Sequence, residues 1–71
     1  MEVISQKIKK LSEREMQCLY WAGQDKTLYE TAQQLQLSPE TIKRYRKFIL
    51  HKLNCQTMTG ALAIAFKEGI L

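Results

Sequence analysis

A cluster of cationic side chains is the feature of this sequence best suited to a chemical task. The cluster lies within residues 41–67, and the rest of the chain has five basic and seven acidic residues. The net charge of +4 therefore arises from a mildly acidic body that carries a cationic segment. Clustered Lys and Arg bind phosphate groups, so this asymmetry indicates a polyanionic partner. Charge alone leaves a solvated helix face as an equal alternative. The segment from residue 41 to residue 67 contains no acidic residue and six basic ones: Lys43, Arg44, Arg46, Lys47, Lys52 and Lys67.

Residues that could perform catalysis or bind a metal are scarce. No pair of acidic residues is placed for acid–base chemistry, and no Gly-rich loop is present to hold a phosphate. Cys18, His51 and Cys55 are too few for a four-ligand structural metal site. We therefore expect no enzyme activity, no cofactor and no metal, with both cysteines reduced.

Length and composition indicate one globular domain. The 71 residues include only one Pro and three Gly, which is little material for a turn-rich β fold. No stretch approaches the roughly 18 apolar residues of a membrane span. Residues 1–10 lack the apolar region of a signal peptide, so we expect a cytoplasmic protein.

Capping residues predict where the first two helices begin. Ser12 followed by Glu15 forms a capping-box pattern, and the helix that it opens carries Met16, Leu19 and Tyr20 as apolar residues and ends near Gly23. Thr27 and Glu30 repeat the pattern before a second helix of about ten residues. A helix this short is unstable alone and must pack on another element.

The third predicted helix, over residues 39–53, carries the cationic cluster. Ser38 suits the N-cap, and Pro39 suits the first helical position. A tight turn over residues 36–38 joins this helix to the second one, which is the plan of a helix-turn-helix. The spacing of 3, 4 and 4 residues places four apolar side chains on one face: Ile42, Tyr45, Ile49 and Leu53. The opposite face gathers Lys43, Arg44, Lys47 and His51.

A fourth helix is predicted from a Thr57 cap to about Glu68, with Gly69 ending it. The helix is apolar all round, so it needs cover on more than one side. The domain core covers one side, and we expect a second subunit on the other. Ala61, Ile64 and Ala65 are the predicted dimer contacts, because small residues permit close approach. The alternative is an Ala face that simply tolerates solvent.

Three blocks of this sequence resemble the LuxR-type (GerE/FixJ/NarL) DNA-binding domain, in the right order over roughly residues 11–69. Leu11-Ser12-x-Arg14-Glu15 through Leu19 resembles the family's L-[ST]-x-R-E-x-E-x-L. Trp21-Ala22, Lys26-Thr27 and Ala32 resemble W-A-x-x-G-K-[ST]-x-x-x-I-A. Leu37-Ser38-x-x-Thr41-Ile42-Lys43 with Ile49-Leu50-x-Lys52-Leu53 resembles I-S-x-x-T-V-K…I-x-x-K-L.

The resemblance implies an all-α, four-helix domain over residues 11–71, with residues 1–10 as an N-terminal extension or linker remnant. It implies sequence-specific binding of double-stranded DNA by a bacterial or phage transcription regulator, nucleoid-associated when bound and homodimeric through the fourth helix. The third helix would enter the major groove. The matching positions assign base contacts to Lys43, Arg44 and Lys47, backbone contacts to Lys26 and Thr27, and the head of the recognition helix to Thr41.

Several residues depart from the family pattern. Asp25 replaces a usual Gly, so it places negative charge near the phosphate or changes the turn. Tyr45 replaces a usual His, and Phe48 replaces a usual Asn. Arg46 replaces an aliphatic residue; its stem would lie on the core and its guanidinium would reach a phosphate. Lys52 is a further predicted phosphate contact.

Two other functions are compatible with the same residues. One is an interaction module that forms heterodimers with a full-length LuxR-type regulator and blocks it. The other is the promoter-reading unit of a sigma factor, which also uses a helix-turn-helix. The closing Ala-rich helix favours the LuxR-type interpretation over the sigma-factor one.

Overall fold

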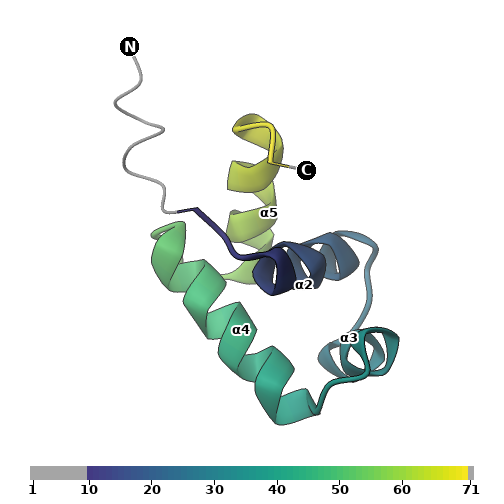
Figure 1. Cartoon of the computed structure of the whole chain (residues 1–71). Coiled ribbons are helices and arrows are strands. Elements are labelled where there is room, and N and C mark those ends of the chain that lie inside the picture. The colour runs from purple at the N-terminus through teal and green to yellow at the C-terminus, as the bar shows by residue number, and fades with distance from the viewer. Residues whose placement is uncertain (1–9, 71) are drawn as a thin grey trace.

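Four helices and no strand make up the part of the chain that the computed structural model describes, residues 10–70. They are α2 (Glu13–Gly23), α3 (Leu28–Leu35), α4 (Pro39–Lys52) and α5 (Met58–Lys67) (Figure 1). The all-α, four-helix prediction is confirmed. The predicted extension over residues 1–10 lies outside the described residues except for Lys10. None of the helices in residues 10–70 combines the length and the apolar character that a bilayer span requires.

Each helix begins with a Ser or Thr side chain that accepts a backbone N–H from the first turn. The capping boxes predicted at Ser12 and Thr27 are both present, since Glu15 and Glu30 bond back to the N-cap N–H groups. These caps satisfy donors that the helix itself leaves free. The four N-cap residues are Ser12, Thr27, Ser38 and Thr57.

Each helix ends in the same way, with one residue in the left-handed backbone region. The φ angles are 64° at Asp25, 57° at Gln36, 55° at Asn54 and 74° at Gly69. The N–H of the next residue then bonds to the carbonyl five positions earlier, as from Lys26 to Trp21 at 3.1 Å. This is the Schellman arrangement, which usually carries Gly at the left-handed position. Only Gly69 follows that preference.

Helices α2 and α4 form the centre of the packing, because they contact each other and each also contacts both α3 and α5. Among the described residues, α3 and α5 do not contact each other, and they lie at different ends of the assembly (Figure 1). The core between the helices includes fully buried Leu19, Ile42 and Ile49. One face of α4 is therefore fixed inside the domain, and the opposite face is free.

The inner face of α2 differs from the prediction. Leu19 is buried as expected, but Met16 and Tyr20 are exposed, and Cys18 and Glu15 face the core instead. The carboxylate of Glu15 can face the core because a cationic side chain from α4 pairs with it. Tyr20 lies edge-to-face on Trp21, with ring centroids 5.1 Å apart.

Helix α5 also presents a different face from the one expected. Ala61 and Ala65 are fully buried inside this chain, and Ile64 is half-buried, so the two alanines are not on the surface where a second subunit could contact them. Their small size serves a close approach within the chain. Helix α5 packs against α2, and a Cβ added to Gly23 would lie only 3.3 Å from Leu62 Cδ2.

Candidate nucleic-acid interface

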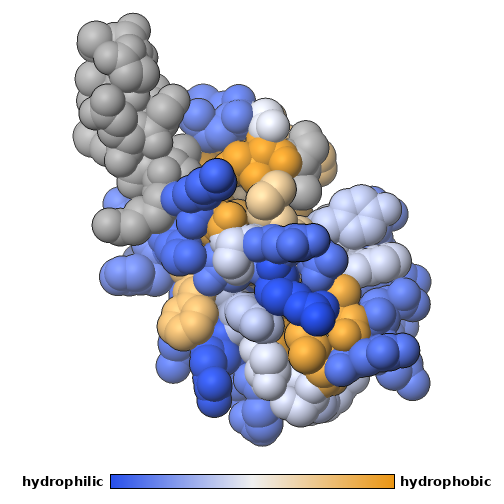
Figure 2. Space-filling view, viewed as in Figure 1, coloured by the Kyte–Doolittle hydropathy of each residue, from blue (hydrophilic) through white to orange (hydrophobic). Residues whose placement is uncertain are grey.

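Helix α4 separates an apolar face from a cationic face as its spacing predicted. Ile42, Ile49 and Leu53 are buried in the core, and Tyr45 is half-buried against it. Figure 2 shows hydrophilic side chains over the outer edge of α4, at the lower left of the view. The replacement of the usual His by Tyr45 therefore changes the packing of the helix rather than its outer face.

The three predicted base-reading residues all lie on the free face of α4. Lys43, Arg44 and Lys47 are exposed, as is His51. Among residues 10–70, the three cationic side chains make no hydrogen bond or ion pair within the chain. Their charges are available to a partner without breaking an existing contact.

The start of α4 is held by two hydroxyl groups. Ser38 Oγ accepts the Thr41 N–H at 3.2 Å, and the Ser38 and Thr41 hydroxyl oxygens lie 2.9 Å apart. Thr41 is half-buried, so its first role is local, at the head of the helix. The turn that precedes it needs the left-handed conformation of Gln36.

The loop between α2 and α3 places Lys26 at the surface beside Asp25. Asp25 adopts the positive φ that the usual Gly of the family would supply, so the turn is retained and only the charge is new. Thr27 is exposed, but its hydroxyl accepts the Glu30 N–H and its own N–H donates to the Glu30 carboxylate at 2.8 Å. The polar groups of Thr27 are thus engaged in capping α3.

Arg46 links α4 to this loop. Its guanidinium donates from Nη2 to the Lys26 carbonyl oxygen at 3.5 Å, and its Nε is buried without a partner among the described residues. The side chain is half-buried, so its stem lies on the core as predicted. The guanidinium, however, points to the Lys26 backbone, which makes Arg46 a brace between α4 and the loop.

Lys52 is not free for the phosphate contact that the sequence suggested. Its Nζ lies 2.8 Å from Glu15 Oε1, and it also donates to the Lys10 carbonyl oxygen at 3.4 Å. Burial alone would raise the pKa of the Glu15 carboxyl, but Lys52 and Ser12 outweigh burial and hold that pKa below its ordinary value. The pair therefore ties the end of α4 to the start of α2. The sequence did not predict this pair, because Glu15 and Lys52 lie 37 positions apart.

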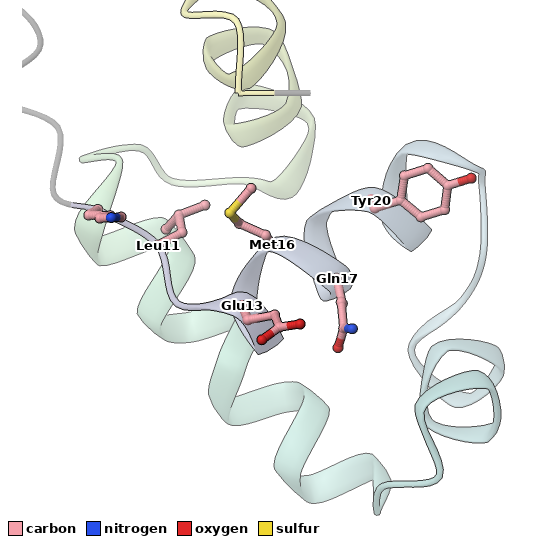
Figure 3. Close-up of a pocket in the computed structure, with 6 residues that line it drawn as sticks. Leu11, Glu13, Met16, Gln17 and Tyr20 are labelled. Carbon is pink, nitrogen blue, oxygen red and sulfur yellow. The ribbon is translucent and has the colours of Figure 1, made fainter.

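A shallow pocket lies on α2, apart from the outer face of α4 (Figure 3). Leu11 and Met16 give it an apolar floor, and Glu13 adds a negative charge at its edge. Lys10 offsets this charge, so the lining has no net charge and the pocket does not extend the cationic surface. The complete lining is Lys10, Leu11, Glu13, Met16, Gln17 and Tyr20.

Comparison with known proteins shows which proteins this sequence is similar to. A sequence model of the bacterial regulatory proteins of the luxR family matches residues 9–65. The chain is 39% identical over 61 residues to the HTH-type quorum sensing-dependent transcriptional regulator VjbR of Brucella ovis and of Brucella abortus, covering 86% of this chain and 24% of each relative. It is 33% identical over 64 residues to a protein of Pseudomonas aeruginosa, covering 90% of this chain and 31% of that relative. The chain thus spans a quarter to a third of the length of these relatives.

Proposed function

This chain belongs to the luxR family of bacterial regulatory proteins, and from that premise we propose that it binds double-stranded DNA sequence-specifically, with α4 in the major groove. The observation that carries the proposal is the free cationic face of α4, opposite a face that the core holds in place. A helix about 10–12 Å across fits a major groove about 12 Å wide. We also propose that it regulates transcription in the cytoplasm, at the nucleoid.

The positions of the exposed cations separate those that contact bases from those that contact the phosphate backbone. Arg44 can donate two parallel hydrogen bonds to the O6 and N7 atoms of guanine. Lys43 and Lys47 flank it on the outer face of α4 and reach base edges or the adjacent phosphates. Lys26 lies on the loop beside α3 and contacts the phosphate backbone, where it sets the register of the helix.

Two measurements on the purified chain test the proposal. Selection of bound sequences from random duplexes should return one preferred motif. The affinity for that motif should fall with salt at a slope of about −2.7 in log K against log salt for about three phosphate contacts per recognition helix. A flat salt response, or the absence of a preferred motif, would refute the proposal.

Variants on α4 and on the loop distinguish the two kinds of contact. Arg44→Ala should relax the preference at one base pair and lose about 1–3 kcal/mol of discrimination there. Lys26→Ala should weaken all sequences equally and reduce the salt slope by about 0.9. Lys67→Ala, which removes an exposed cation from α5, serves as the control. It should change the base preference less than Arg44→Ala does and the salt slope less than Lys26→Ala does.

We propose that the exposed side of α5 forms a homodimer contact, which would place two recognition helices on half-sites about one DNA turn apart. Since Ala61 and Ala65 are buried, the candidate contacts are exposed Ala63 and Phe66 beside half-buried Ile64. The Phe66 side chain is 64% exposed, so a second subunit that covers it would remove a large apolar surface from water.

Sedimentation of the chain at a range of concentrations tests this contact. Phe66→Asp should give monomers at concentrations where the unaltered chain is a dimer, and Tyr29→Asp, a change at an exposed aromatic on α3, should leave the dimer intact. A dimer that survives Phe66→Asp would rule out α5 as the interface. The same surface would serve a heterodimer with a full-length relative, which co-sedimentation with such a regulator would detect.

A further inference from the structure

Phe48 is the exposed large apolar side chain of α4, and it lies outside the buried core. It is 44% exposed, and it is not among the partly buried apolar residues that pack against the core. The exposed part of this ring lies beside the cationic face of α4, so it is available to a partner that binds that face.

The position of Phe48 on the helix sets what that partner can be. It lies one turn beyond Arg44 and just under one turn before His51, so these three exposed side chains share a side of α4. At 1.5 Å of rise per residue, Phe48 is about 6 Å further along the axis than Arg44. On the next turn, Lys52 is held by Glu15 at 2.8 Å, so Phe48 stands at the border between the cationic face and the body of the domain.

A partner for this position must accept an apolar ring and several positive charges at once. A hydrophobic protein groove would accept the ring but would bury the charges of Arg44 and Lys47 at high cost. The floor of the major groove offers guanine acceptor atoms and one apolar group, the C5-methyl of thymine, within one surface. The mixed chemistry of this helix face therefore fits duplex DNA containing thymine.

We propose that Phe48 contacts a thymine C5-methyl group and makes thymine the preferred base at one position of each half-site, an inference that rests on the proposed DNA binding. The axial separation of about 6 Å, divided by a base-pair rise of about 3.4 Å, places this thymine about two base pairs from the base that Arg44 reads. The ring and the methyl group exclude water from each other when they meet.

Replacement of thymine by deoxyuridine, which lacks only the methyl group, tests the assignment. The motif returned by selection is synthesised with deoxyuridine at each thymine position in turn, and each duplex is titrated with the chain. We expect one position per half-site to lose affinity about fourfold, the value for one buried methyl group. Phe48→Ala should bind the thymine and deoxyuridine duplexes equally at that position, whereas Tyr20→Ala, a change at an exposed aromatic on α2, should retain the fourfold difference.

The possible outcomes separate this inference from the proposed function. Equal affinity of the unaltered chain for all deoxyuridine duplexes would overturn the methyl contact while leaving DNA binding intact. The same follows if Phe48→Ala keeps the fourfold difference, or if it weakens both duplexes equally. No binding to any duplex by the unaltered chain would refute the proposed function itself. Thermal unfolding of Phe48→Ala checks that the variant is folded, which its exposed position predicts.

Discussion

Replacement of Lys52 by Met should destabilise the domain through the Glu15 carboxylate that remains. The Lys52 ammonium lies 2.8 Å from Glu15 Oε1, and the Glu15 side chain is only 4% exposed. At an effective dielectric constant of about 20, the attraction at this distance is about 6 kcal/mol before any cost of desolvation. Most of that is offset by removing the charges from water, and hydrogen bonds to charged groups contribute about 1.5–3 kcal/mol net.

The exposure of the Lys52 side chain determines how much of this contribution of about 1.5–3 kcal/mol should be lost from the free energy of unfolding. Its side chain is 29% exposed, so solvent screens the pair in part, and we expect Lys52→Met to lower the free energy of unfolding by about 1.5–2 kcal/mol. For a domain of this size each kcal/mol corresponds to about 4–8 °C, so the Tm should fall by about 6–16 °C. Lys47→Met, on the same helix but with an exposed side chain, should change stability by less than about 0.5 kcal/mol.

A double-mutant cycle separates the ion pair from other effects of the substitutions. Glu15→Gln, Lys52→Met and the double variant are unfolded by urea at neutral pH, and we expect a coupling energy of about 1–2 kcal/mol. Additive losses would show that the two side chains do not stabilise each other. A Lys52→Met variant as stable as the unaltered chain would refute the energetic reasoning altogether.

The pH dependence of stability gives an independent check on the same pair. Because the pKa of Glu15 is lowered in the folded chain, its contribution is present above the unfolded-state pKa of about 4.3 and is lost as pH falls through the folded-state value. Glu15→Gln should therefore lose less stability than the unaltered chain between neutral pH and pH 3. Parallel pH profiles for the two proteins would contradict this assignment.

Three further predictions concern the loops and the thiols. Asp25→Gly should stabilise the domain by about 0.5 kcal/mol, because glycine adopts the left-handed conformation of residue 25 without strain. Asp25→Gly and Asp25→Asn, which removes only the charge, should both bind DNA more tightly. Unchanged affinity of Asp25→Asn would refute a role for the charge. Gln36→Gly should add about 1 kcal/mol in urea unfolding, and a loss would mean that the Gln36 side chain matters. Burial raises the pKa of the Cys18 thiol, so Ellman's reagent should modify Cys18 only when the domain unfolds. Rapid reaction of both Cys18 and Cys55 in the folded chain would contradict the packing.

Features encoded by neighbouring residues could be predicted from the sequence. The capping boxes at Ser12 and Thr27 need only residues three positions apart, and both are present. The two faces of α4 follow from the spacing within a single helix, and the buried positions of Ile42 and Ile49 agree with it. The left-handed residue at the end of α2 is Asp25, which carries a weaker signal than Gly for such a position.

Features that depend on two distant segments could not be predicted in the same way. The Glu15–Lys52 pair joins residues 37 positions apart, so no local pattern reveals it. Arg46 donates to a carbonyl 20 positions away, a contact that no local pattern indicates. Helix α5 is apolar around most of its circumference, so its sequence gave no indication that Ala61 would face the core.

The helix boundaries described above also bear on how quickly the domain folds. Every helix start and stop depends on hydrogen bonds between residues within five positions of each other, as from Thr27 to Glu30 and from Leu37 to Ala32. Chains dominated by such short-range contacts close few long loops before they gain stability, and helical domains of this kind fold in microseconds to milliseconds. The bounds of each helix are thus set by its own few flanking residues, although helices this short become stable only when they pack on one another. The packing of α2 and α4 on each other and on the remaining two helices is then the step that joins distant segments of the chain.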